Sequence, residues 1–176
     1  MDATRLSYEE SCRRLQPAIL DKGVIPPVPG RVPRYDDEIP GVSIFRMLLG
    51  ADLNLSNLSL PRTFFGRSEL NGTSLKNTDL TESNLCWNDF IDVDFSGALL
   101  CGADLRASNF ERVNFAGADL RGADMRQSSF DNCLFEHAVL NGAVLTHAQG
   151  KKLLFSEAQR STISWINDDG PEPGGG

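Results

Sequence analysis

The sequence predicts an all-β solenoid, a β-helix built from five-residue units, and two columns of residues carry this prediction. Seventeen consecutive positions spaced by five, from Phe65 to Leu145, are all Leu, Phe or Met. The residue two positions before each of them, from Thr63 to Ala143, is small or fairly small. Roughly one residue in seven is of these three large types in an average protein, so chance does not explain the run.

A five-residue period fits neither the 3.6-residue turn of an α-helix nor the plain alternation of a flat strand. It fits a short strand whose large residue and whose small residue two positions earlier both point inward, while the residue between them points outward. That outward residue is often Asp or Asn, which suits the turn and the strand edge rather than acid–base chemistry. The other two residues form the corner, where Gly tolerates unusual backbone angles and occurs at positions 97, 102, 117, 122 and 142.

Two nearly perfect copies of the unit are Gly102-Ala103-Asp104-Leu105-Arg106 and Gly117-Ala118-Asp119-Leu120-Arg121. They resemble the pentapeptide-repeat family, whose consensus is Ala-Asp/Asn-Leu-X-X, and the in-phase match covers residues 63–147. The resemblance implies a right-handed quadrilateral parallel β-helix in which four of the five-residue units make one coil.

The residues support a coil of four units independently of the resemblance. From Phe90 onward the large residues repeat in the order Phe, Phe, Leu, and then Leu or Met. Phe therefore recurs on two adjacent sides, and stacked coils would place the rings about 4.8 Å apart along the axis.

The sequence divides into four parts. Residues 1–50 predict a short helix opened by a capping box from Ser7 to Glu10, an extended Pro-rich linker, and an apolar cap over 42–49 that lies on the open end of the first coil. Residues 51–148 form the β-helix. In 149–167 a C-terminal cap closes the last coil with Phe155, Ile163, Trp165 and Ile166, and 168–176 form a flexible tail.

The first units have a different apparent phase. Ala51-Asp52-Leu53 and Ser56-Asn57-Leu58 match the unit, but the next large position in this phase would be residue 63 rather than 65. We therefore expect a two-residue insertion near Leu60-Pro61, as a bulge or small loop or as a functional loop.

Composition limits the classes of function. The formal net charge of −7 argues against direct binding to nucleic acid or to an anionic membrane, because both need a cationic surface. No apolar run approaches the roughly 20 residues of a membrane span, and no secretion signal precedes the repeats. The four cysteines match no zinc or redox spacing and predict free thiols in a reducing cytoplasm.

No catalytic apparatus is apparent. His137 and His147 are half a coil apart and should lie on opposite sides, so they cannot share a metal ion. Cys86 and Cys101 are expected to point outward and Cys133 inward, none of them near a histidine. We therefore predict a protein with no catalytic residues, no metal site and no cofactor.

Sorting the charges by side gives the candidate binding residues. The side of Leu70, Phe90, Phe110 and Phe130 has one base, Arg112, and predicts an acidic partner-binding surface formed by Glu69, Asp89, Asp92, Glu111 and Asp131. The side of Leu85, Leu105 and Met125 is nearly balanced. A second group is apolar and expected outside: Trp87, Ile91, Leu134, Val139 and Val144. Its members in the last coil, Leu134, Val139 and Val144, either pack under the C-terminal cap or form an interface.

These observations favour a non-enzymatic interaction protein that presents flat solenoid sides to a protein partner. The family resemblance implies a sharper alternative. Some members of that family resemble B-DNA in shape and charge, occupy the DNA saddle of type II topoisomerases such as gyrase, and protect them from inhibitors. Here the acidic surface would have that role, and a homodimer through one solenoid end stays open.

Overall fold

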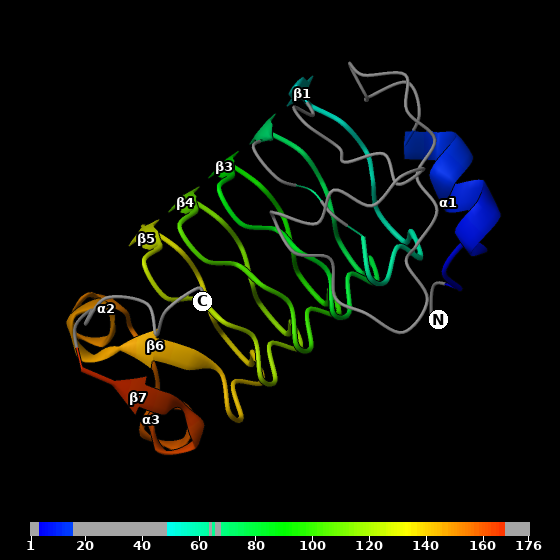
Figure 1. The fold of residues 1–176 in the computed structure, drawn as a ribbon. Coiled ribbons are helices and arrows are strands. Elements are labelled where there is room, and N and C mark those ends of the chain that lie inside the picture. Colours follow the sequence, from blue (N-terminus) through cyan, green and yellow to red (C-terminus); the bar gives the residue numbers. More distant parts are fainter. Residues whose placement is uncertain (1–3, 16–48, 64, 66–67, 168–176) are drawn as a thin grey trace, which may run out of the picture.

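The computed structural model describes residues 4–15, 49–63, 65 and 68–167. Its centre is a right-handed quadrilateral β-helix, as predicted (Figure 1). One side is a parallel five-stranded sheet in the order β1 to β5, in which each strand pairs with its equivalent in the next coil. The strands are β1 (Leu49–Ala51), β2 (Glu69–Asn71), β3 (Asp89–Ile91), β4 (Asn109–Glu111) and β5 (Ser129–Asp131).

The other three sides are narrower, because neighbouring coils are joined there by single parallel bridges. Following the chain from β1–β5, we call them the second, third and fourth sides. They are represented by the bridges Asn54↔Ser74, Ser59↔Asp79 and Asn84↔Asp104. In every case the bridging residue points outward and directly precedes a large inward residue, so the predicted coil of four units is confirmed.

Stacked side chains fill the coil. Phe90, Phe110 and Phe130 stack behind the β1–β5 side with ring centroids 5.0–5.1 Å apart. Phe95, Phe115 and Phe135 form a second column behind the second side at 5.0–5.4 Å. The two columns meet edge to face, for example Phe110 against Phe115 at 5.5 Å. The predicted pair of Phe columns on adjacent sides is therefore confirmed.

The corners use left-handed backbone more widely than the glycines suggested. Eighteen described corner residues, each two after a position of the large column, have a φ near +60°, and six of them are Gly. Trp87, with φ +61°, is the bulkiest of the others. A large side chain in this region is uncommon, and the ladder of hydrogen bonds on both sides of the corner holds it there.

The expected insertion near Leu60-Pro61 is wrong. Asn54 bridges Ser74 and Ser59 bridges Asp79, so the register of the later coils already holds in the first coil. Leu55 and Leu60 are the large inward residues there, while Leu53 and Leu58 occupy the position two before them. Because Leu stands at both inward positions of these units, the sequence allows two phases, and only the hydrogen-bonded register distinguishes them.

At the N-terminal end, helix α1 (Tyr8–Leu15) begins with the predicted capping box, in which the Ser7 backbone N–H donates to Glu10 and the Glu10 N–H donates to Ser7 Oγ. Ser11 Oγ accepts from the Ser59 backbone N–H at 2.7 Å, and Leu15 is 1% exposed in the core. The helix thus docks on the first coil. The Pro-rich linker and the apolar cap over 42–48 lie outside the described residues, as do 168–176.

At the C-terminal end, the last coil keeps the register while its shape changes. Its elements are β6 (Val144–Thr146), α2 (His147–Lys152), α3 (Glu157–Thr162) and β7 (Ser164–Ile166), and β6 pairs with β7 in parallel. Phe155 lies 5.1 Å from Phe135, its equivalent one coil earlier. Phe155 and Ile163 are buried, and Trp165 and Ile166 are partly buried. In this last coil, helices α2 and α3 replace two of the four sides.

Two glutamines join this cap to the solenoid. Gln149 and Gln159 are the third residues of capping boxes that begin α2 and α3. The Gln149 side-chain amide donates to the Met125 and Ser128 carbonyls, and Gln159 does the same at Phe135 and Ala138. Each glutamine thereby satisfies a carbonyl, that of Ser128 or Ala138, which a further coil would otherwise have bonded, as Ser129 and Val139 bond the Ser108 and Ala118 carbonyls one coil below. In the described ranges, no helix is both long and apolar enough to cross a membrane.

Candidate functional site: the acidic side and its hollows

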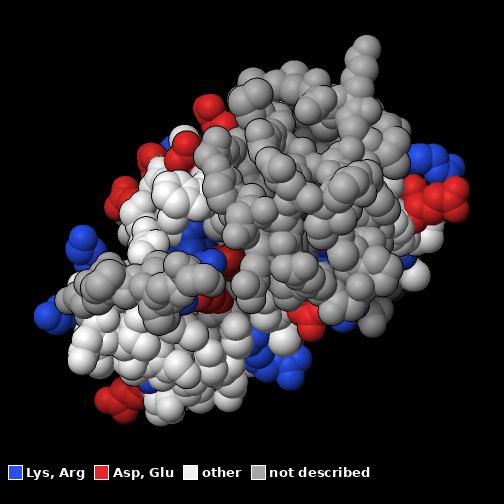
Figure 2. Space-filling model, in the orientation of Figure 1, with Lys and Arg blue, Asp and Glu red and all other residues white. Residues whose placement is uncertain are grey.

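The five predicted acidic residues all lie on or beside the β1–β5 side. Glu69 and Asp89 are register partners on β2 and β3, and Glu111 and Asp131 are register partners on β4 and β5. Asp92 is at the corner that follows β3. Figure 2 shows Asp and Glu residues, in red, along the border of the molecule that β3, β4 and β5 form in Figure 1. Like charges in register repel each other, so this side has a negative potential.

Arg112 divides this acidic surface. Its Nε and Nη2 bind Asp92, one coil below, at 2.6 and 2.7 Å, and its Nη1 binds Glu111. The hydrogen bonds to Arg112 hold the pKa of Asp92 below its usual value, and in return they raise the pKa of Arg112. Within the described ranges Glu69, Asp89 and Asp131 form no ion pair, so on this side Arg112 pairs only with Asp92 and Glu111.

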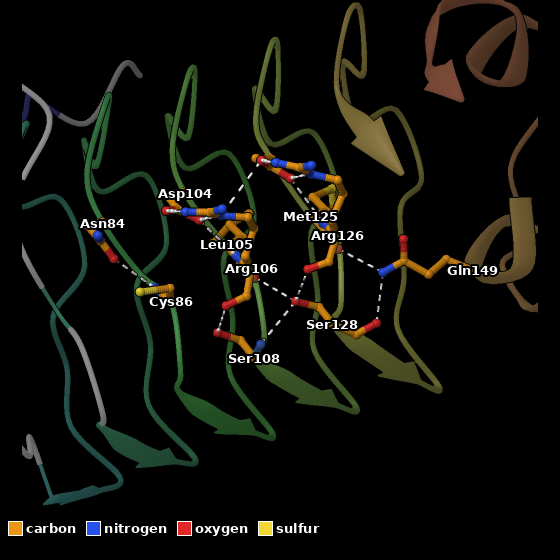
Figure 3. Close-up of polar contacts among 11 residues, drawn as sticks. Asn84, Cys86, Asp104, Leu105, Arg106, Ser108, Met125, Arg126, Ser128 and Gln149 are labelled. Atoms are coloured by element: carbon orange, nitrogen blue, oxygen red, sulfur yellow. Dashed lines mark hydrogen bonds and ion pairs between the residues drawn. The ribbon is translucent and has the colours of Figure 1, made fainter. Parts of the chain in front are cut away.

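The other three sides use their carboxylates differently. Every outward Asp or Asn described there accepts a hydrogen bond from the backbone N–H two residues later, an Asx turn that caps the corner. Asp104 also binds the Arg106 guanidinium (Figure 3). Asp124 binds Arg126 in the same way.

Backbone geometry explains this difference. On the β1–β5 side, the residue after the large one still belongs to the strand, as Ile91 and Glu111 do, so its N–H bonds to the neighbouring coil. The preceding Asp89 therefore has no free N–H to cap. Its carboxylate is left to solvent or to a partner.

Trp87 is the largest exposed apolar side chain beside this surface. It is 59% exposed at the corner between the fourth and the β1–β5 sides. A hollow of about 320 Å³ lies next to it, lined in part by Asp89, Asn109 and Gln127. An exposed tryptophan next to hydrogen-bonding groups is typical of an interaction hot spot. Ile91, two residues beyond Asp89, is half-buried.

The apolar residues predicted to cluster at the last coil, Leu134, Val139 and Val144, do not form one cluster. Val144 belongs to β6 and packs in the C-terminal cap, while Leu134 and Val139 stay 55% and 41% exposed. Leu154 is 97% exposed and was not predicted, although it stands one coil after Leu134 in the outward column. That spacing is the signal that would have found it.

The cysteines and histidines form no reactive site in the described ranges. Cys86, expected to point outward, lies beside Asn84, Asp104 and Arg106, but it is only 3% exposed and burial raises its pKa to about 11. Cys133 is half-buried and burial raises its pKa to about 11 as well. His137 occupies a corner, whereas His147 begins α2 and stacks on Trp165 at 5.8 Å. No three His, Cys, Asp or Glu side chains of this part of the chain gather as metal ligands.

Comparison with known proteins agrees with this geometry. The family model "Pentapeptide repeats" matches residues 48–85 and 89–127 in 8 copies. No curated protein matches the sequence significantly.

Three solved structures illustrate the likeness. HetL, a pentapeptide repeat protein involved in heterocyst differentiation regulation in the cyanobacterium Nostoc, is 23% identical over 56% of this chain and 46% of its own, with a TM-score of 0.47. A pentapeptide repeat protein of the Arabidopsis thaliana thylakoid lumen is 22% identical over 67% and 78%, also at 0.47. QnrB1, a plasmid-mediated fluoroquinolone resistance protein, is 18% identical over 53% and 48%, at 0.27.

The family match falls on the coils that the hydrogen-bonded register defines. The solenoid of this chain is therefore a pentapeptide-repeat β-helix.

Proposed function

We propose that this protein is a non-enzymatic interaction protein that binds a basic surface of a protein partner through its β1–β5 side. The observation that carries the proposal is a set of three carboxylates on this side, Glu69, Asp89 and Asp131, that have no ion pair among the described residues. Asp89 also lines the hollow beside the exposed Trp87. Stacked side chains fill the coil interior, so the solenoid offers outer surfaces for recognition rather than an enclosed substrate cavity.

The side suits a partner for two further reasons. Its backbone is held by a continuous ladder, so the carboxylates lie on a rigid support and lose little conformational freedom on binding. Among the described residues only Arg112 forms ion pairs with the carboxylates of this side, and the remaining negative charge favours fast, salt-dependent association with a cationic surface.

A pull-down from the native host with the immobilised protein tests this proposal. Asp89→Lys should abolish capture of the partner, and rising salt should weaken it. Glu136→Lys is the matched control, because Glu136 is also exposed and free of ion pairs in the described structure but lies on the second side. Equal capture by both variants would exclude the β1–β5 side as the binding surface.

A second candidate is a DNA mimic that binds gyrase or another type II topoisomerase and protects it from inhibitors. It is favoured by the register of Glu69 with Asp89 and of Glu111 with Asp131, which places carboxylates on successive coils as in a row of phosphates. Arg112 binds Asp92 and Glu111, and this pairing reduces the net negative charge of that row.

A gyrase supercoiling assay with and without a quinolone tests the second candidate. Protection should be lost in an Asp89→Lys, Asp92→Lys double variant. No effect of micromolar wild-type protein on supercoiling or on quinolone inhibition would exclude it, while leaving the broader interaction role to the pull-down.

A further inference from the structure

Among the residues that the structure describes, strand β5 has a free edge. It is the last strand of its sheet, because the chain that would form a sixth strand folds into α2 instead. One coil below, the Arg112 N–H donates to the Asp131 carbonyl at 2.8 Å, and Asn132 has no equivalent acceptor among the described residues. The backbone N–H and C=O of Phe130 also have no hydrogen-bond partner among the described residues on this side of β5. In the described part of the chain, only the Ser128 carbonyl of this edge is occupied, by Gln149.

A hollow of about 610 Å³ lies along this edge, between β5 and α2. Its lining combines backbone and side chains of Gln127 to Asp131 with Ala148, Lys152 and Leu153. It also shares Gln127 and Ser129 with the hollow beside Trp87.

The ring of Phe130 lines this hollow because its column stops there. The equivalent residue one coil later is Gly150, which has no side chain to stack on Phe130. A Cβ at Gly150 would clash with the ring of Trp165, so the cap itself requires the glycine. Phe130 is consequently half-buried, whereas Phe90 and Phe110 are at most 1% exposed.

We propose that the free edge of β5 binds an extended segment of a partner protein, which adds as a sixth parallel strand. Unpaired strand edges bind peptides in this way, with main-chain hydrogen bonds for affinity and side-chain pockets for specificity. The register of Ser129, Phe130 and Asp131 defines the preferred segment: a small polar residue, then a large apolar residue, then Lys or Arg.

Each position of that pattern has its own reason. The large apolar residue would stack on Phe130 and continue the Phe column. The basic residue would stand opposite Asp131, with Glu111 one coil below in the same column. Lys152, a cation of α2 that lines the hollow, would repel a second base, so one basic residue is expected rather than a run.

This site is an edge and does not depend on partner binding by the β1–β5 side. The test is a titration of the ¹⁵N-labelled full chain with the peptide acetyl-Gly-Ser-Phe-Lys-Gly-amide. Amide signals of Phe130 and Asn132 should shift, and their hydrogen exchange should slow. Asp131→Lys should weaken the peptide about two- to fivefold, the range of a cross-strand charge pair. The matched Glu136→Lys, on the second side, should leave the affinity unchanged.

Methylated peptides test the hydrogen bonds themselves. In a parallel sixth strand the peptide Lys N–H would donate to the Phe130 carbonyl, while the peptide Phe N–H would point away. N-methylation of the Lys should therefore abolish binding, and N-methylation of the Phe should preserve it. Equal effects of the two methylations, or shifts confined to residues around Glu69 and Asp89, would overturn the proposal. The latter result would still support the β1–β5 side as a binding surface.

Discussion

The β1–β5 side and the fourth side carry the same residue type at the same position, and the two sides use it for different purposes. Asp89 and Asp104 both directly precede a large inward residue. Asp104 caps its corner and binds Arg106, whereas Asp89 makes neither contact within the described ranges. The decisive group is the backbone N–H two residues later, which is free to be capped on one side and committed to the ladder on the other. Local hydrogen bonding thus separates structural carboxylates from available ones.

Removing a structural carboxylate should have the largest effect on stability. Asp124 accepts the Arg126 backbone N–H and binds the Arg126 guanidinium at 2.7 and 2.9 Å. Asp124→Ala should lower the free energy of unfolding by about 1–2 kcal/mol, the sum of one lost cap and the partly buried ion pairs with Arg126 and Arg106. Urea denaturation measures the change. Asp89→Ala should stay within about 0.5 kcal/mol, and a comparable loss there would contradict the distinction.

Adding a missing cap should have the next largest effect, in the opposite direction. Leu134 occupies an outward position of the second side where Asp94 and Asn114 cap their corners. Leu134→Asn should raise the free energy of unfolding by about 0.5–1 kcal/mol, because it caps the Glu136 N–H and can extend the side-chain bond from Asn114 to Asp94.

Ser129→Asn supplies the contrast for this second experiment. Position 129 is the equivalent outward position on β5, and the N–H two residues later belongs to the ladder. Thermal unfolding should show no gain for this variant. An equal gain in stability for Leu134→Asn and Ser129→Asn would show that the difference between the sides does not come from the N–H that is bonded in the ladder.

The smallest effect should come from charge alone. Hydrogen bonds from Arg121 hold the pKa of Asp119 below its usual value. A lowered pKa in the folded state stabilises the protein above the unfolded pKa, near 4, and this stabilisation disappears as pH falls through the folded value. Asp119→Asn keeps the acceptor for the Arg121 N–H but should lose about 0.2–0.5 kcal/mol at pH 7, because Arg121 is largely exposed.

Urea titrations at pH 7 and near pH 2.5 check the sign of this effect. The difference between Asp119→Asn and the wild type should shrink toward zero at the lower pH. Asp89→Asn, at a carboxylate without an ion pair in the described structure, should show no such change. A difference that persists at low pH would assign the effect to something other than the charge.

Much of this could be predicted from the sequence, because the solenoid repeats its own geometry. The five-residue step and the Phe columns place Glu69, Asp89, Glu111 and Asp131 on one side without any coordinates. The phase of the five-residue unit in the first coil could not be predicted, because Leu stands at both inward positions, 53 and 55, and therefore fits either phase. Nor could the burial of Cys86, which depends on how the neighbouring side chains of another coil pack.

The unequal use of the four sides was also hidden from the sequence. The pattern treats Asp89 and Asp104 alike, and only the hydrogen-bonded register shows that one side is a true sheet and three are single bridges. The pairing of Arg112 with Asp92 was within reach, since the two are one coil apart in the same column. The hollow at β5 could not be predicted, because it exists only where the chain forms helix α2 instead of a sixth strand.

Because of the two capping glutamines, the number of coils in this solenoid can change without changing how the C-terminal cap binds to it. Gln149 and Gln159 recognise carbonyls of the coil immediately below them, and every coil presents its carbonyls in the same places. An in-phase duplication of one whole coil would therefore move the cap outward by one step and leave its contacts unchanged. A duplication slightly shorter or longer than one coil would break the register of every side at once. Such a chain can change its reach in discrete steps while each end keeps its own chemistry.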